Sequence, residues 1–401
     1  RRQRHLCIRD ITLGFMLLRT NDWVKPIREE MFLLVLKKIE NCSVSELLFS
    51  VQHLEKLHRS ERIGYADIDV LSSRFYDRLE RILPDIPFDK IRFFEFDTRK
   101  IIYRLLMKKK VLDFRQINYL LEHEKHSFCK QILVTGTLQY YDCTAEQIEI
   151  YLKNKSSIVR RKAMEYKYSI IKDYWDGLEM MLLDENRGVR EQAVYILRHH
   201  SDICILDFYI EHLQDENPLN AIVGIGENGG AEEGRLILPF LKSSVNKIVC
   251  ATLRALAKII ETDGYEIYSQ YLASKEPAVS KAAYYAIRYN TIHYGSENLY
   301  QFCIQHDCPH IKKYALLLLL RENSWSRLPF LLDLYRREDF KEHGDLILQG
   351  IIKRDMYGRI SKQQEEWINR ILNEMEDVLP VSLPKAIRFD MKFLVEKNTD
   401  K

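Results

Sequence analysis

The chain has 401 residues, of which 46% are hydrophobic and 30% are charged, and this balance excludes an intrinsically disordered protein. Glycine (15) and proline (10) are scarce for this length, which favours helices joined by short loops over a protein built from many strands. The formal net charge of +3 gives no overall electrostatic argument for binding nucleic acid or an acidic membrane.

Cysteine usage and hydropathy bear on location. The eight cysteines are scattered and form no CxxC pair, so we expect reduced thiols and a cytoplasmic protein. No apolar run approaches the roughly 18–20 residues that cross a bilayer, so we expect no membrane insertion by these residues. The chain opens with Arg1-Arg2-Gln3-Arg4 and no initiator Met. These basic residues fit the cytoplasmic flank of a membrane anchor preceding the chain, and they equally fit a trimmed surface helix.

The first third of the chain is helical in pattern but irregular. Apolar residues such as Met31, Leu34 and Val35 follow helical spacing within residues 1–118, yet no thirty-residue register is visible there. The clearest break is Leu83-Pro84-Asp85-Ile86-Pro87-Phe88. We therefore predict a divergent helical N-terminal region over 1–118.

Two basic stripes are the candidate binding residues. Lys100, Arg104 and Lys108 follow one side of a predicted helix, and Arg160 and Arg161 open another. Such residues could contact phosphate groups or a partner protein. Solvated helix faces are the simpler explanation of both stripes.

The middle of the chain is repetitive. Two columns of apolar residues recur about every thirty positions, and repeats of this length are typical of stacked solenoids. The first column is Val159, Val189, Leu219, Ile248, Val279 and Ile311. The second column is Leu152, Leu182, Leu213, Leu241, Leu272 and Ile304.

Each copy of the repeat predicts two amphipathic helices joined by a polar turn. Because such a pair cannot bury its apolar faces alone, each pair needs a neighbour on either side. Four residues after the first column the side chains are small, as close helix packing requires. These residues are Ala163, Ala193, Val223, Thr252, Ala283 and Ala315.

Two motifs in the repeats could carry chemistry. Residues 224–229 match the dinucleotide fingerprint GxGxxG, but no strand precedes them, and we interpret the glycines as a turn between helices. Cys303, His306, Cys308 and His310 could bind zinc, yet their spacing is too compressed for the usual two separated pairs. We therefore predict no cofactor and no metal.

Other side chains in the repeats are open to two interpretations. His199 and His200 stand where a helix is expected to end, and there they complement the helix dipole. Tyrosine is plentiful (23), for example at Tyr284, Tyr285 and Tyr289, and tyrosines outside packing positions could serve a protein interface.

The C-terminal part begins with a helix start signal. Ser361 and Gln364 predict a capping box before an amphipathic helix that includes Ile368 and Leu372. A helix with a polar outer face would cap the last layer of the repeats. Beyond Pro380 the residues fit a loose strand or a helix equally well.

The repeat segments resemble a known family. Residues 186–197, 275–287 and 307–320 resemble the first helix of HEAT-like repeats of the bilin-lyase type, and 221–241 resembles their helix–turn–helix pattern. The family's Arg after the first column is present only in some copies. The resemblance implies an all-α, right-handed α-solenoid of HEAT-like helix pairs. The expected organisation is the N-terminal region 1–118, the repeats 119–358, and a capping helix with tail 359–401.

Function is less constrained than fold. With no catalytic signature in the chain, we expect a non-enzymatic scaffold whose concave surface binds another protein or a further domain of its own parent chain. Nucleic-acid binding is the first alternative, because some HEAT-like solenoids similar to this chain are alkylpurine DNA glycosylases. A chromophore-lyase subunit is the second, and it depends on the resemblance to bilin lyases alone.

Overall fold

The computed structural model describes residues 12–259, 265–355, 359–375 and 377–394, and every regular element within them is a helix. The prediction of an all-α protein is confirmed. The basic start Arg1–Arg4 lies outside the described residues. None of the described helices combines the length and the apolar character that a membrane span requires.

The chain divides into two compact units. Unit 1 comprises residues 1–178 and 186–201, and unit 2 comprises 179–185 and 202–401. The division therefore falls within the segment 119–358 and not at either of its ends.

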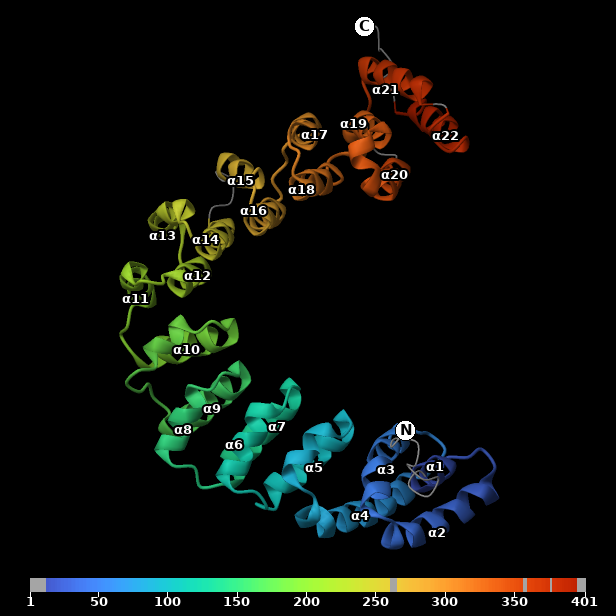
Figure 1. Cartoon of the computed structure of the whole chain (residues 1–401), viewed down its shortest axis with the longest axis vertical. Helices are drawn as coiled ribbons and strands as arrows, with labels where there is room; N and C mark the ends of the chain where they lie inside the picture. Colours follow the sequence, from blue (N-terminus) through green and yellow to red (C-terminus); the bar gives the residue numbers. More distant parts are fainter. Residues whose placement is uncertain (1–11, 260–264, 356–358, 376, 395–401) are drawn as a thin grey trace. The chain divides into compact units, whose positions relative to one another are not determined.

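Helices of unit 1 alternate in their packing. Each odd-numbered helix from α1 to α7 packs against the next odd-numbered helix: α1 contacts α3, α3 contacts α5, α5 contacts α7 and α7 contacts α9 (Figure 1). The intervening α6 and α8 each pack on the helix that follows. This alternation is already present within residues 1–118, where the sequence shows no regular repeat. The helices are α1 (Thr12–Arg19), α2 (Lys25–Asn41), α3 (Val44–Leu57), α4 (Tyr65–Ile82), η2 (Leu83–Asp85), η3 (Phe88–Phe93), α5 (Phe96–Lys108), α6 (Phe114–His123), α7 (Ser127–Tyr140), α8 (Ala145–Leu152), α9 (Ser157–Ile171) and α10 (Arg187–His200).

Unit 2 continues the same order of contacts. Helices α12, α14, α16 and α18 pack one against the next, and further along α17 contacts α19, which contacts α21. The helices are η4 (Glu179–Leu183), α11 (Ile205–Glu211), η5 (His212–Gln214), α12 (Leu219–Asn228), α13 (Ala231–Ile237), η6 (Leu238–Lys242), α14 (Asn246–Ile259), α15 (Tyr265–Leu272), α16 (Pro277–Tyr289), α17 (Ser296–Gln305), α18 (Pro309–Leu319), α19 (Ser324–Arg336), η7 (Glu338–His343), α20 (Gly344–Ile352), α21 (Lys362–Glu374) and α22 (Ser382–Met391).

The first apolar column is buried at five of its six positions, with Leu219 as the exception. Leu219 and Val223 are only half-buried, whereas Pro218 and Ile222 are buried. Pro218 is the N-cap of α12, so the buried face of this helix begins one residue earlier than the repeat alignment places it. The predicted register of the first column is therefore wrong by one residue in this copy and correct in the others. The second column is also buried at five of its six positions, and its exception is Ile304, which is half-buried beside the buried Cys303.

The glycines of the GxGxxG match are packing residues. Gly224 and Gly226 lie inside α12, so their interpretation as a turn is wrong, and only Gly229 ends the helix. A Cβ on Gly224 would lie 2.2 Å from the ring of Tyr209, and one on Gly226 would lie 2.5 Å from Cβ of Ala255. Only glycine lets α12 approach its neighbours this closely.

Only one of the two hydrogen bonds of the predicted capping box forms at the start of α21. The side chain of Ser361 accepts a hydrogen bond from the backbone of Gln364 at 3.2 Å. The Gln364 amide does not return the bond to the cap, because it donates instead to the Trp325 carbonyl at 2.8 Å. The residues beyond Pro380 include α22, which packs on α21.

Candidate functional site

The predicted basic stripe on α5 divides into two parts. Nζ of Lys100 lies 3.1 Å from Oδ1 of Asp97 and 3.5 Å from Oε2 of Glu55, so this charge is neutralised. Arg104 and Lys108 are exposed, and neither forms an ion pair within the part of the chain that the structure describes. Two of the five predicted residues thus remain as cations available to a ligand, on one side of one helix.

The second predicted stripe lies on α9, away from the first. Arg160 is only 8% exposed, and its Nη1 donates hydrogen bonds to the carbonyls of Asn154 at 2.7 Å and Lys155 at 3.1 Å. Its guanidinium therefore holds the turn before α9. Arg161 is exposed, with Nε 3.6 Å from Oε1 of Glu165.

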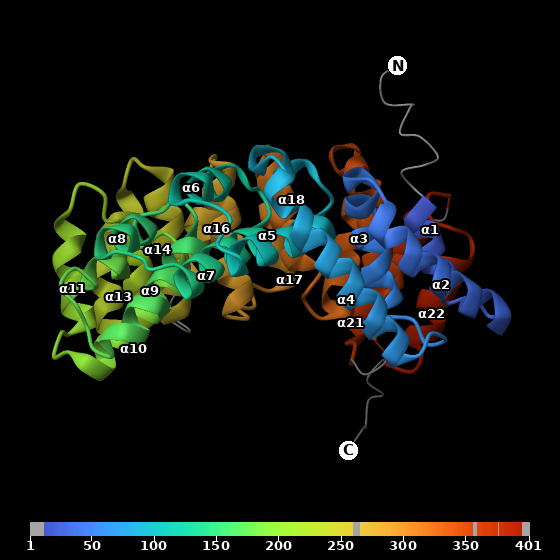
Figure 2. The ribbon, with the colours of Figure 1, turned by 90° about the horizontal axis from the view of Figure 1, so that it is seen from below.

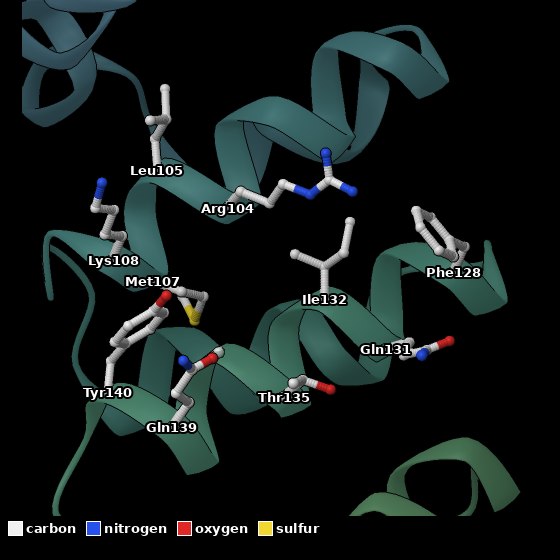
Figure 3. A pocket seen from close by; sticks show the side chains of 11 residues that line it. Arg104, Leu105, Met107, Lys108, Phe128, Gln131, Ile132, Thr135, Gln139 and Tyr140 are labelled. Atoms are coloured by element: carbon white, nitrogen blue, oxygen red, sulfur yellow. The ribbon is translucent and has the colours of Figure 1, made fainter.

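Arg104 and Lys108 border a groove between α5 and α7 with a volume of about 390 Å³. Apolar side chains from both helices line it, and Ile132 projects from α7 toward α5, facing the Arg104 side chain (Figure 3). Leu105, Met107 and Phe128 complete the apolar lining. Gln131, Thr135, Gln139 and Tyr140 add amide and hydroxyl groups along α7.

A glycine fixes the separation of the two walls. A Cβ on Gly136 would lie 2.5 Å from Cβ of Met107, so any larger residue would push α7 away from α5. Next to it, the Thr137 hydroxyl donates to the Leu133 carbonyl at 2.7 Å and lies 3.6 Å from Sδ of Met107. The groove is therefore bounded at this end by tight helix packing.

A buried carboxylate ties α5 to the segment before α7. Glu124 is 2% exposed and accepts hydrogen bonds from the hydroxyl of Tyr103 at 3.0 Å and from the backbone of His126 at 2.8 Å. Nη1 of Arg99 lies 3.3 Å from Oε1 of Glu124, the same oxygen that accepts the hydrogen bond from His126. Burial, and then the charge of Glu124, raise the pKa of Tyr103 far above its usual value. Nothing in the sequence separates Glu124 from the exposed Glu122 nearby, so this residue was not predicted.

The groove combines three kinds of side chain. Its lining consists of apolar groups, of the amides and hydroxyls along α7, and of the two basic groups on α5. Arg104 and Lys108 place basic side chains at its edge. The arrangement suits a ligand that has an apolar group beside an anionic one.

The remaining candidate motifs do not converge on a site. Cys303 is buried, and burial raises the pKa of its thiol to about 12. Nε2 of His310 lies 3.0 Å from the carbonyl of Ser274, and Nδ1 of His199 lies 2.7 Å from that of Tyr195. Among the described residues no three His, Cys, Asp or Glu side chains form a group that could hold a metal.

In comparisons with known proteins, no family model and no curated protein sequence matches the chain. What the chain binds must therefore be inferred from its own side chains and their arrangement.

Proposed function

We propose that the chain is an α-solenoid of HEAT-like helix pairs that serves as a non-enzymatic scaffold and binds a segment of another polypeptide in the groove between α5 and α7. The alternating order of helix contacts in each unit supports the solenoid. The composition of the groove supports the polypeptide ligand.

The observation that carries the proposal is that Arg104 and Lys108, which form no ion pair with any residue that the structure describes, border a largely apolar groove of about 390 Å³. Such a site favours a segment with a bulky apolar side chain next to Asp or Glu. The lining residues of α7 run from Phe128 to Tyr140, which is about 18 Å at 1.5 Å per residue. An extended segment of about five residues has this length, so the groove matches a peptide better than a compact metabolite.

The test is a selection of random linear peptides displayed on phage against the full chain. Enriched peptides should carry an acidic residue within two positions of a large apolar one. In Thr135→Trp the indole should fill the groove and abolish binding of a selected, synthesised peptide, because Thr135 is exposed on the groove wall. Asn118→Trp places the same side chain at an exposed position of α6 and should bind normally. No enrichment, or equal binding by both variants, would refute the site.

The charge preference has its own test. Reversing both cations in Arg104→Glu/Lys108→Glu should turn the selection from acidic toward basic peptides, because the apolar lining is unchanged. Arg161→Glu reverses an exposed charge on α9 and should leave the preference acidic. A preference that stays acidic in the double variant would show that other residues select the ligand.

The solenoid arrangement can be tested within unit 2 by spin labels. Label pairs on α14 and α16 should lie about one interhelical distance apart, close to 10 Å, and pairs on α14 and α18 about twice that. Arg254, Tyr285 and Lys313 provide exposed positions on the three helices. Equal distances for both pairs would indicate a globular bundle instead.

A further inference from the structure

The small net charge of the chain hides a separation of charge in unit 2. Helices α14, α16 and α18 contain no Asp or Glu. The helix that precedes each of them in the chain, α13, α15 or α17, contains at least one. The three acid-free helices pack side by side in chain order (Figure 1; the same ribbon is seen from below in Figure 2). Their basic residues are Lys247, Arg254, Lys258, Lys281, Arg288, Lys312 and Lys313.

Most of these charges are available to a ligand. Lys258 lies 3.9 Å from a carboxylate oxygen of Glu227, and Lys312 lies 2.7 Å from one of Asp339. The other five are exposed and form no ion pair within the described ranges of the chain. A surface with this many unpaired cations attracts a polyanion.

Exposed residues of the three helices occupy equivalent positions. Arg254 follows the buried Ile248 by six residues, as Tyr285 follows the buried Val279. Lys281 and Lys313 likewise each follow a buried residue, Val279 or Ile311, by two residues. On α16 itself, Lys281 and Arg288 lie seven residues apart, which places them on one helix face. Because corresponding positions of packed helices face the same side, these residues form one surface.

Tyrosines stand among these cations. Tyr285 is 47% exposed and Tyr289 is 67% exposed, so both rings are accessible to a ligand. Nζ of Lys281 lies 6.0 Å from the centre of the Tyr285 ring. Beneath them the buried Tyr284 stacks on Tyr314 with ring centres 5.1 Å apart, and it meets Tyr285 edge-on at 5.2 Å. The Tyr285 ring is thus supported from below by packed aromatic side chains.

We propose that this surface binds single-stranded nucleic acid, with phosphates on the cations and bases stacked on Tyr285 and Tyr289. The surface is called the basic tyrosine face below and comprises Arg254, Lys281, Tyr285, Arg288, Tyr289 and Lys313. Cations interleaved with exposed aromatic rings are the combination that unpaired bases recognise. An acidic polypeptide would use the cations, but its charged residues offer no ring that stacks on the tyrosines, whereas each nucleotide carries both a phosphate and a base. A duplex keeps the faces of its bases stacked inside. The proposal is independent of the groove in unit 1.

The test measures binding of fluorescein-labelled oligothymidylate of twenty nucleotides to the full chain by anisotropy, over a series of salt concentrations. Arg254→Gln/Lys281→Gln/Arg288→Gln should lower the slope of log affinity against log salt by about two, since each lost phosphate contact on a single strand contributes about 0.7. Lys362→Gln/Lys385→Gln/Lys392→Gln removes the same charge from exposed positions of α21, α22 and the C-cap of α22, and its slope should match that of the wild type. Equal slopes for the two triple variants would overturn the proposal.

The tyrosines distinguish nucleic acid from other polyanions. Tyr285→Ala/Tyr289→Ala should weaken oligothymidylate binding roughly thirtyfold, since each of the two lost stacking contacts costs at least about fivefold. Binding of polyglutamate should not change, and Tyr65→Ala/Tyr195→Ala, which removes two exposed tyrosines of unit 1, should bind like the wild type. Tighter binding of polyglutamate or of duplex DNA than of the single strand would overturn the proposal. Thr135→Trp, which fills the groove, should leave oligothymidylate binding unchanged.

Discussion

The hydroxyl of Tyr103 donates a hydrogen bond of 3.0 Å to Glu124, and both side chains are buried. Tyr103 belongs to α5, and Glu124 belongs to the segment that leads from α6 into α7. The bond therefore connects α5 with the start of α7, the two helices that form the walls of the groove. Because a buried carboxylate is stable only when its oxygens are satisfied, the partners of Glu124 fix where α7 begins relative to α5.

Removing one partner of this carboxylate should destabilise unit 1. We expect Tyr103→Phe to lower the free energy of unfolding by about 1.5–3 kcal/mol, the range for a hydrogen bond to a charged group. Glu124→Ala should cost more, about 3–5 kcal/mol, because it leaves Arg99 and Tyr103 without their partner. Tyr119→Phe removes a hydroxyl from a half-buried ring of α6 and serves as the control. Chemical denaturation measures all three, and a Tyr103→Phe variant as stable as the control would contradict the role of Glu124.

The glycines of α12 provide a second prediction. Gly224→Ala and Gly226→Ala should each destabilise unit 2 by about 1–3 kcal/mol, because the added Cβ would overlap Tyr209 or Ala255. Gly230→Ala is the control, since the nearest atom to its added Cβ is a carboxylate oxygen of Glu233 at 3.6 Å. Melting temperatures give the comparison. Alanine is a better helix former than glycine and stabilises a helix at an uncrowded site. If Gly224→Ala and Gly226→Ala stabilised the protein, the close approach of Tyr209 and Ala255 to α12 would be contradicted.

The interpretation of these glycines shows a limit of sequence reasoning. Their spacing is compatible with a turn, and nothing local shows that Tyr209 and Ala255 press against α12. The repeat columns, in contrast, were predictable because burial follows helical periodicity: Val159, Val189 and Val279 are all buried as expected. Periodicity identifies which face of a helix is covered, but it does not show how close the covering helix comes.

A buried arginine gives the third prediction. Arg327 stands fourth in α19 and donates to the carbonyls of Leu320 and Glu322 through Nη1 and to those of Gly350 and Lys353 through Nη2, at 2.5–3.4 Å. Arg327→Met should lower the free energy of unfolding of unit 2 by about 3–5 kcal/mol, because four carbonyls lose a charged donor.

Arg336→Met is the matched control for that change. Arg336 is on the same helix, but its partners are the carboxylates of Asp333 and Glu374 at the surface. Such surface pairs contribute about 1 kcal/mol or less. Denaturant titration of both variants decides the matter, and similar losses would show that the carbonyl bonds of Arg327 are not important for stability.

Buried Cys303 predicts a loss of stability in alkali. Burial raises the pKa of its thiol from 9.0 to about 12, so the folded state keeps the proton that the unfolded state loses above pH 9. The stabilisation is therefore complete below pH 9 and declines as the pH rises toward 12. Between pH 8.0 and 10.5 the unfolding free energy of the wild type should fall by about 2 kcal/mol more than that of Cys303→Ala. Identical pH dependence of the two proteins would contradict this assignment.

Charge was harder to predict than burial. Arg160 and Arg104 were both candidate contacts for phosphate or a partner, yet the structure buries Arg160 against carbonyls and leaves Arg104 exposed at the groove. The net charge of +3 is a sum over the whole chain, in which acidic and basic segments cancel. It therefore gives no sign that α14, α16 and α18 contain no Asp or Glu. The groove itself depends on the close approach of Gly136 to Met107, which are 29 residues apart in the sequence and belong to two different helices.

The central claim is that a polypeptide segment binds between α5 and α7, and hydrogen–deuterium exchange with a selected acidic peptide tests it most directly. Backbone amides of 96–108 and 127–140 should exchange more slowly when the peptide is bound, and the same amides in Thr135→Trp should not respond to it. Protection confined to other helices, or protection that persists in Thr135→Trp, would contradict the claim.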